Sequence, residues 1–320
     1  MRKVKYLDLF SGIGATHESF TQLYNENICE GDIVNYCEWE DWIAKAYSIA
    51  HNTSIEKNLG DITKVDTSDI EKDIDLMTYG FPCQDLSMLG DQKGLFDKDG
   101  NMTRSGLFFE AIRIAKNIQP KVLIAENVKS LTFKNKKDEF QYMLDTLDSI
   151  GYNSYWKVLD AKKHGLPQSR QRVFIVSIRK DIDDYKFIFP EDEELKVVAS
   201  DLYLNDSVTD DLYLNEHQIK TYAKNEMRLR KQYSSVNKDI TICQTTKQGQ
   251  KSNPQNFIED DNGIRIMSAD EVLVFQGFRK GIGTTLLENG FTTAQVGFMS
   301  GNSLSVKIMK KLIINTMKYY

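Results

Sequence analysis

The sequence DLFSGIGA, residues 8–15, joins a strand-like apolar segment to a helix-like one. Glycine has no Cβ atom, so Gly12 and Gly14 allow a tight turn and a close approach of the backbone to a ligand. The first backbone amides of the following helix have no partner within the helix, so they are free to bind a ligand. A dinucleotide-binding loop would place a third glycine at position 17, where this chain has His17. The stretch therefore predicts a strand–turn–helix unit but disfavours a pyrophosphate-binding NAD site.

Short β-rich segments alternate with longer helical ones on both sides of this turn. Such alternation is typical of an α/β fold, a doubly wound, mostly parallel sheet with helices on both faces. The expected strands are 5–9, 33–38, 75–79, 122–125, 152–159 and 172–178. The expected helices are 16–24, 41–50, 107–118 and 138–150, with a final amphipathic helix at 305–317.

Composition limits the class of protein. The 320 residues allow one large core and a smaller module, since single cores stop growing at about 250 to 300 residues. No apolar run approaches the ~20 residues of a membrane span, and the amino-terminal segment lacks the pattern of a signal peptide. The four cysteines form no CxxC pair. We therefore expect a cytoplasmic protein with reduced thiols and no bound metal.

The net charge of −5 hides a contrast between two neighbouring segments. Residues 191–216 hold nine acidic side chains and one lysine, whereas residues 217–256 hold eight Lys and Arg against two acidic residues. The second segment is either a solvated face or a surface for phosphate groups. We predict that residues 1–186 and 290–320 form the large domain, and that residues 187–289 form a smaller mixed domain.

Residues at the ends of the first strands suit an adenosine ligand that carries no phosphate. Glu38 lies 24 residues after Gly14, where an acid accepts hydrogen bonds from ribose hydroxyls. Trp39 is placed to stack on adenine, although core packing is the alternative for a single Trp. These features predict S-adenosylmethionine as the cofactor. The expected contacts are Phe10, Ser11, Gly12, Gly14, Glu38, Trp39, Asp61 and Ile62.

Four further segments follow in a fixed order: GFPCQDLS at 80–87, AENV at 125–128, QSRQR at 168–172 and GNSLSV at 301–306. With the glycine turn, they resemble the DNA (cytosine-5)-methyltransferase family, in its bacterial or phage modification form. The resemblance covers nearly the whole chain. Only residues from about 186 to 262 lack a shared pattern, as expected of the variable target-recognition region in that family. It adds Asn302 and Ser303 to the expected cofactor site.

The resemblance implies a covalent mechanism on a cytosine that is flipped out of duplex DNA. Carbon 5 of cytosine is a poor nucleophile, so a thiolate, that of Cys83, first adds to carbon 6. Alone, Cys83 would be read as an inert buried thiol. Glu126 would protonate or hydrogen-bond ring nitrogen 3. Arg172 would bind the cytosine carbonyl oxygen, while Arg170 would support the pocket and a nearby phosphate; both would also stabilise the thiolate.

Sequence selection is expected in the basic segment, because its Gln and Thr side chains can read base edges while Lys and Arg hold the backbone. The expected readers are Gln244, Thr245, Gln248 and Gln250. The residues expected to contact the phosphate backbone of the DNA are Lys220, Arg228, Arg230, Lys247 and Lys251. Ser87, Lys93 and Arg104 lie on a glycine-punctuated loop that would close over the DNA, with an ordinary surface loop as the alternative.

The sequence leaves three other functions open. The first is methylation of a tRNA cytosine, since relatives with that activity share the same motifs. The second is a non-catalytic DNA-binding protein that retains the fold, and the third is a nicotinamide dehydrogenase, which His17 disfavours. The short chain suggests a monomer of the restriction-modification or phage protection type, with a companion restriction endonuclease encoded nearby.

Overall fold

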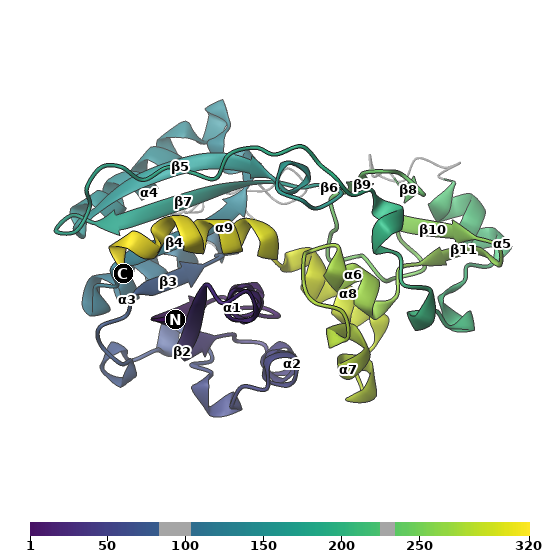
Figure 1. Ribbon diagram of the computed structural model, residues 1–320, viewed down its shortest axis with the longest axis horizontal. Coiled ribbons are helices and arrows are strands. Elements are labelled where there is room, and N and C mark those ends of the chain that lie inside the picture. Colours follow the sequence, from purple (N-terminus) through teal and green to yellow (C-terminus); the bar gives the residue numbers. More distant parts are fainter. Residues whose placement is uncertain (83–103, 225–233) are drawn as a thin grey trace.

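The computed structural model describes residues 1–82, 104–224 and 234–320, and Figure 1 shows a large sheet-containing part beside a smaller part. The strands of the large sheet are β1 (Arg2–Leu9), β2 (Cys29–Cys37), β3 (Leu76–Tyr79), β4 (Val122–Val128), β5 (Tyr152–Asp160) and β7 (Gln171–Arg179). Its helices are α1 (Ala15–Asn25), α2 (Asp41–His51), α3 (Phe108–Ile118), α4 (Lys137–Ser149) and α9 (Val306–Thr316). Each of these elements was predicted from the sequence to within a few residues.

The six strands lie in the order β2-β1-β3-β4-β7-β5. β1 pairs in parallel with β2 and β3, and β3 pairs in parallel with β4. β7 is antiparallel to both of its neighbours, β4 and β5. The prediction of a doubly wound, mostly parallel sheet is therefore confirmed, with β7 as the reversed strand.

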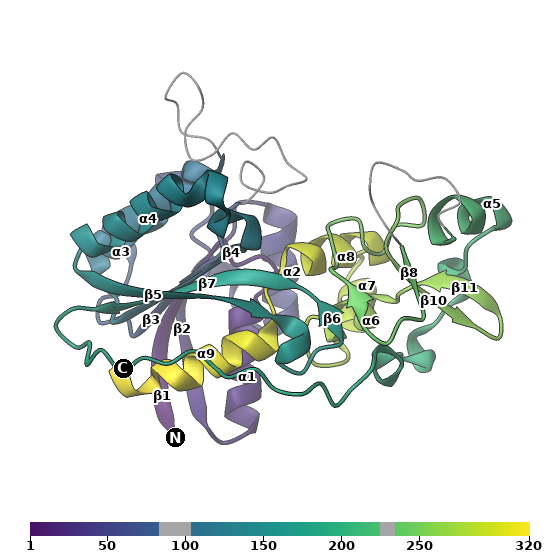
Figure 2. The same cartoon turned by 90° about the horizontal axis from the view of Figure 1, so that it is seen from above.

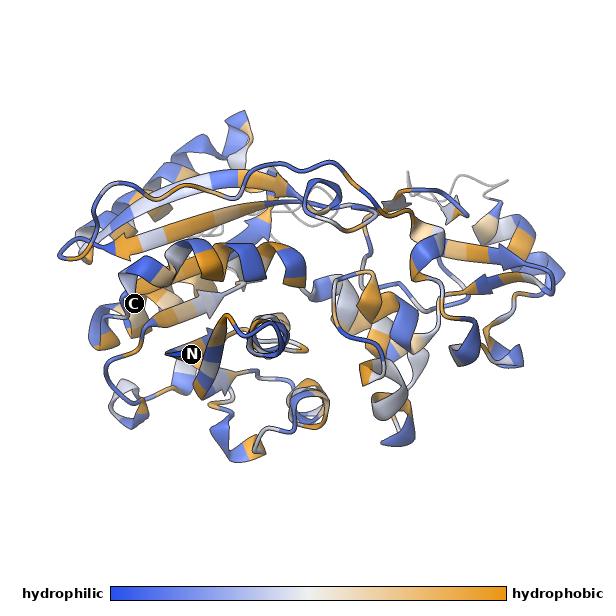
Figure 3. Ribbon diagram, viewed as in Figure 1, coloured by the Kyte–Doolittle hydropathy of each residue, from blue (hydrophilic) through white to orange (hydrophobic). Residues whose placement is uncertain are grey.

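Alternate residues of each strand fill the cores on opposite faces of the sheet, as the two-residue period of a strand requires. In β4, Leu123 and Ala125 pack with residues of α3 and α4. Val122 and Ile124 pack with residues of α1 and α9. Figure 2 shows these two helix pairs on either side of the sheet, and Figure 3 shows the hydrophobic residues along β7. No helix in the described ranges is long and apolar enough to cross a bilayer.

The smaller part is built on short strands. β11 (Gly263–Ile266), β10 (Asn256–Asp260) and β8 (Ser235–Val236) form one sheet. β9 (Thr241–Ile242) pairs in parallel with β6 (Gln168–Ser169) and so connects the two parts. The helices α5 (Glu216–Gln218), α6 (Ala269–Val274), α7 (Ile282–Glu288) and α8 (Thr293–Asn302) complete this side of the molecule.

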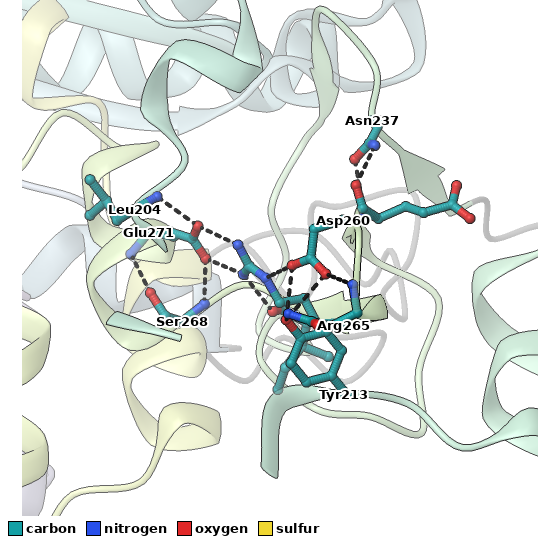
Figure 4. Close-up of polar contacts among 10 residues, drawn as sticks. Leu204, Tyr213, Asn237, Asp260, Arg265, Ser268 and Glu271 are labelled. Carbon is teal, nitrogen blue, oxygen red and sulfur yellow. Dashed lines mark hydrogen bonds and ion pairs between the residues drawn. The ribbon is translucent and has the colours of Figure 1, made fainter. Parts of the chain in front are cut away.

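A buried ion pair joins the small sheet to α6 (Figure 4). The Arg265 guanidinium is fully buried, and its two terminal nitrogens lie 2.7 and 3.0 Å from the oxygens of Glu271. Its Nε donates to Asp260 at 3.1 Å. Glu271 also accepts from the backbone amides of Ser268 and Leu204, at 2.7 and 2.9 Å. This paired carboxylate therefore orients three segments of the smaller part.

The chain between the two parts first runs along the outside of α9 (Figure 1). Asn315 donates to the carbonyl of Ile188 at 2.9 Å, and Lys311 pairs with Glu193 at 2.8 Å. Asp192 pairs with Lys163 at 2.6 Å. These contacts attach residues 188–193 to the large part. The domain boundary after residue 186 stays a prediction. The attached residues 188–193 follow that boundary in the chain.

Candidate active site

The turn after β1, residues 10–14, lies at the carboxyl edge of the sheet beside the end of β2. The Gly12 amide donates to a Glu38 carboxylate oxygen at 3.1 Å, and the Ser11 amide donates to the Cys37 carbonyl at 3.0 Å. Phe10 and Gly12 both have φ of 54°, a left-handed conformation. A Cβ atom built on Gly12 would meet no atom within 4 Å. The backbone at Gly12 therefore faces open space, as a ligand-binding turn requires.

Gly14 has a different role from Gly12. A Cβ atom built there would lie 2.6 Å from both His51 Nε2 and Tyr47 Cε2, side-chain atoms of α2. Gly14 thus allows the start of α1 to pack closely against α2. The cofactor contact predicted for Gly14 has no open space beside it, whereas Gly12 has.

The acid and the aromatic ring predicted for adenosine lie next to this turn. Glu38 is buried, which raises the pKa of its carboxyl, while backbone amides that include those of Glu40 and Gly12 oppose the shift. Trp39 beside it is 70% exposed, so it is not a core residue, and its ring is available for stacking. Asp61 instead caps its own turn by accepting from Thr63, and Ile62 is buried in the core.

Asn58 was not identified from the sequence, yet it holds these pieces together. Its Oδ1 accepts from the amides of Glu38 and Gly60, at 2.9 and 3.2 Å. Its Nδ2 donates to the Glu38 carbonyl at 3.0 Å. A lone Asn between a strand and a turn has no pattern in the sequence that would indicate this role.

The predicted catalytic acid and one predicted arginine meet at the ends of β4 and β7. The Nε of Arg172 forms an ion pair with Glu126 Oε1 at 3.2 Å. Burial raises the pKa of the Glu126 carboxyl, although the charges of Arg172 and Arg170 oppose this. Next to Glu126, the buried Asn127 donates to the carbonyl of Phe81 at 3.1 Å. Asn127 thereby fixes the segment that leads directly into Cys83.

Several predicted residues lie beyond what the structure describes. Cys83, Ser87 and Lys93 fall in the range 83–103, and Arg228 and Arg230 fall in the range 225–233. Arg104 begins a short turn, but its side chain is not described. Their roles stay predictions.

Arg170 does not lie where a phosphate contact would place it. Its side chain is buried, with one terminal nitrogen donating to the Gln244 carbonyl at 3.0 Å and the other to the Gly301 carbonyl at 3.2 Å and to Ser303. These carbonyls belong to the segment after β9 and to the end of α8. The predicted phosphate contact is wrong for this structure, because the buried Arg170 instead joins its own segment to the segment after β9 and to the end of α8.

The prediction that Gln244 and Gln248 read bases is also wrong. Both side chains are 1% exposed. The Gln244 oxygen accepts from Ser300 at 2.7 Å and from Gln276 at 3.3 Å. The Gln248 amide is bonded to Asn256, which it both donates to and accepts from. Amides that are buried and satisfied inside the protein are not available to base edges.

Close packing on α8 explains why these glutamines are buried. A Cβ atom on Gly297 would lie 1.8 Å from the Gln248 carbonyl oxygen, and one on Gly301 would lie 2.1 Å from the Thr245 carbonyl carbon. The two glycines are four residues apart, so they form a flat strip on one face of α8. The loop 244–250 rests on that strip. Of the predicted DNA contacts in this loop, Thr245 is exposed, and Lys247 and Gln250 are partly exposed.

The remaining predicted residues are placed as follows. Asn302 is exposed at the end of α8, whereas Ser303 is buried and supplies a carbonyl to Arg170. Lys220 pairs with Glu216 at 2.8 Å on the surface of the smaller part, and Lys251 is partly exposed. Cys243, to which the sequence analysis gave no role, has its sulfur beside both Arg170 and Arg172.

Solved methyltransferase structures share this fold. The Entamoeba histolytica methyltransferase EhMeth aligns over 99% of this chain and 98% of its own, with a TM-score of 0.76 and 16% sequence identity. The S. pombe Dnmt2 methyltransferase aligns over 97% of both chains, with a TM-score of 0.71 and 20% identity. The fold is therefore that of a methyltransferase.

The sequence matches the C-5 cytosine-specific DNA methylase family over residues 4–318, and the chain belongs to that family. The resemblance inferred from the motifs is thus confirmed, and the members of the family are enzymes. Type II methyltransferase M.HaeII of Haemophilus aegyptius is 30% identical over 98% of this chain and 92% of its own length. M.NgoBI of Neisseria gonorrhoeae is 32% identical over 96% and 90%.

Two other relatives match over a shorter region. M2.ScrFI of Lactococcus lactis subsp. cremoris is 42% identical, and M.BsuFI of Bacillus subtilis is 35% identical. The chain spans less than half the length of each, 44% and 42% respectively.

Proposed function

We propose that this protein transfers a methyl group from S-adenosylmethionine to carbon 5 of a cytosine in a specific duplex DNA site. The observation that carries the proposal is the meeting of Glu126, Arg172 and Asn127 at one edge of the sheet. Asn127 holds the carbonyl of Phe81, two residues before Cys83 in the chain, while the neighbouring Glu126 forms an ion pair with Arg172. Family membership over residues 4–318 supports the same chemistry.

The turn at residues 10–14, together with Glu38 and Trp39 after β2, fits the adenosine part of S-adenosylmethionine. Open space at Gly12 admits a ligand atom close to the backbone. Glu38 would accept hydrogen bonds from ribose hydroxyls, and the exposed Trp39 would stack on the adenine ring. Asn302 would line the same edge. When bound, this cofactor supplies an electrophilic methyl group.

The residues of the chain would make the cytosine ring nucleophilic. The Cys83 thiolate forms a bond to carbon 6, and the displaced electron pair moves through the ring toward nitrogen 3. Glu126, whose pKa is raised by burial, donates a proton or a hydrogen bond at nitrogen 3 when its carboxyl is protonated. Arg172 holds the carbonyl oxygen of the base. Because these groups cannot reach a stacked base, the cytosine is flipped out at a cost of a few kcal/mol.

The cellular setting follows from the type II relatives. We propose that the protein acts in the cytoplasm as a monomer within a restriction-modification or phage protection system, with a companion restriction endonuclease. The recognition surface is assigned to residues 187–289, within which Thr245, Lys247 and Gln250 remain candidates for DNA contact.

Tritium transfer from methyl-labelled S-adenosylmethionine tests the reaction on duplex DNA and on tRNA in parallel. We expect label in DNA, located at carbon 5 of cytosine by bisulfite sequencing. Label in tRNA alone, or in neither nucleic acid, would contradict the proposal.

The covalent step has its own test. In the presence of S-adenosylmethionine, a duplex with 5-fluorocytosine at the target should trap the wild-type enzyme in a denaturant-stable adduct, because after methyl transfer fluorine does not leave as a proton does. Cys83→Ser should form no adduct but should still bind the cofactor by calorimetry. Cys29→Ala, at the buried thiol that begins β2, is the matched control and should be trapped like the wild type.

A further inference from the structure

The thiol of Cys243 lies beside the ion pair that Glu126 and Arg172 form. Cys243 directly follows β9, and the parallel pairing of β9 with β6 places it next to the segment that contains Arg170 and Arg172. Its sulfur is 3.4 Å from an Nη of Arg170 and 3.8 Å from an Nη of Arg172. Two guanidinium groups therefore share one sulfur atom, which belongs to the smaller part of the molecule.

The partners of Arg172 show what this contact does. Its Nε faces Glu126 at 3.2 Å, and one terminal nitrogen donates to the Gln171 carbonyl at 2.9 Å. The other terminal nitrogen faces Cys243. A planar guanidinium directed from three sides has a defined orientation. Of these three partners, Cys243 is the one that comes from the target-recognition side.

We propose that Cys243 is a positioning residue, whose sulfur orients Arg172 toward the target base and links the recognition segment to the pair formed by Glu126 and Arg172. The proposal rests on the proposed function for its catalytic consequence. The state of the thiol, however, is a property of the free enzyme and is measured without DNA or cofactor.

The charges around the sulfur favour the thiolate. Burial opposes ionisation of Cys243, but the guanidinium groups of Arg170 and Arg172 outweigh it and lower the pKa of the thiol. Burial alone raises the pKa of Cys29, and burial together with nearby carboxylates raises that of Cys37. In its protonated form, Cys243 can donate to the Gln244 carbonyl at 3.4 Å. Deprotonation therefore removes the donor of this backbone contact and leaves the sulfur as an acceptor for the two guanidinium groups.

The first test measures the titration of this thiol. The intact enzyme is alkylated with iodoacetamide over a range of pH, and the peptides that contain each cysteine are quantified by mass spectrometry. We expect the midpoint for Cys243 to lie below that of a free thiol. In Arg172→Gln the midpoint should rise by about 1 to 3 pH units, because an adjacent positive charge is lost.

Lys129→Gln is the matched control for this shift. Lys129 donates to the Gln171 side chain at 2.9 Å, so it removes a charge from the same neighbourhood without touching the sulfur. The Cys243 midpoint should change much less in this variant than in Arg172→Gln. Equal midpoints in Arg172→Gln and the wild type would overturn the proposal.

The second test measures catalysis. Cys243→Ala should lower kcat at least about 10-fold, because a hydrogen bond to a charged group is lost, with little change in the KM for S-adenosylmethionine. Cys243→Ser should recover part of the rate, since a hydroxyl oxygen also accepts from Arg172. The acidic limb of the kcat profile that belongs to this thiol should be absent from the serine variant.

Two results would exclude the positioning role. One is a Cys243→Ala enzyme with the wild-type kcat across the pH range. The other is a 5-fluorocytosine adduct that maps to Cys243, which would make it a nucleophile instead. Thermal unfolding of each variant shows that the protein is folded. A wild type that titrates as expected but transfers no methyl group would reject the proposed function and leave the arginine–thiolate contact standing.

Discussion

The turn at residues 10–14 and the loop at residues 244–250 both contain glycine, but they lie in different environments. Gly12 faces open space, and the neighbouring Trp39 is 70% exposed. The loop 244–250 rests against Gly297 and Gly301 of α8, and two of its glutamines are 1% exposed. The glycine-containing turn therefore lies at an open edge in the first region, whereas the second region is a buried joint. What separates them is whether another helix covers the turn.

The largest effect is expected at the ion pair that supports the covered region. Glu271→Ala leaves the buried Arg265 with Asp260 as its one anionic partner among the residues that the structure describes, and removes the acceptor for two backbone amides. Breaking a buried pair costs about 3 to 5 kcal/mol, so the free energy of unfolding should fall by that amount in urea titrations. Glu259→Ala, on the exposed side of β10, should change it by less than about 0.5 kcal/mol. Similar losses in both variants would mean that the pair adds no stability.

The carboxyl of Asp8, in the strand that leads into the open turn, should make stability depend on pH. Burial raises the pKa of Asp8 from 3.8 to about 7, and Thr78 donates to one of its oxygens at 2.6 Å. Between these pKa values the folded protein holds a proton that the unfolded chain has released, so stability falls as pH rises. Asp8→Asn stays neutral and keeps an acceptor for Thr78. Its stability relative to wild type should therefore increase by about 3 to 4 kcal/mol from pH 4 to pH 8.

Calorimetric or chemical unfolding of both proteins without cofactor measures this difference. Curves for wild type and Asp8→Asn that run parallel from pH 4 to pH 8 would show that Asp8 ionises in the folded protein as easily as in the unfolded chain.

A pair of glycine substitutions tests the contrast directly. Gly297→Ala should destabilise the fold by about 1 to 3 kcal/mol, because its new methyl group would overlap the Gln248 carbonyl. Gly12→Ala meets no atom, so its cost is the strain of a left-handed residue, about 1 to 2 kcal/mol. Its stronger effect should be on calorimetric binding of S-adenosylhomocysteine, since the methyl group enters the proposed cofactor space. Normal binding by Gly12→Ala would place the cofactor elsewhere.

The smallest expected effect concerns the exposed ring. Trp39→Ala should leave the unfolding temperature nearly unchanged but weaken S-adenosylmethionine binding by about 0.5 to 1.5 kcal/mol, the contribution of one aromatic stack. Trp156→Ala is the control, because Trp156 is 46% exposed and packs on Phe140 at the far edge of the sheet. Equal binding losses in the two variants would remove Trp39 from the cofactor site.

The predicted site is partly assembled by the structure. Glu126 and Arg172 come from motifs 46 residues apart in the chain, and antiparallel pairing of β4 and β7 brings them into contact. Gly12 and Glu38 also meet as the order of strands suggested. Asn58 and Cys243 could not be found in the same way, because neither belongs to a local pattern. Their partners are chosen by pairings such as β6 with β9, two strands of two residues each.

The sequence by itself determined the strands of the large sheet, the helices that cover it and the family to which the chain belongs. These follow from local patterns: alternating apolar residues, glycines in a turn and short motifs in a fixed order. Only the tertiary structure decided that Arg170, Gln244 and Gln248 are buried, and that Cys243 meets Arg172. The physical reason is that a polar side chain reads bases or supports the fold according to what covers it. That covering comes from segments, such as α8, that lie far away in the sequence.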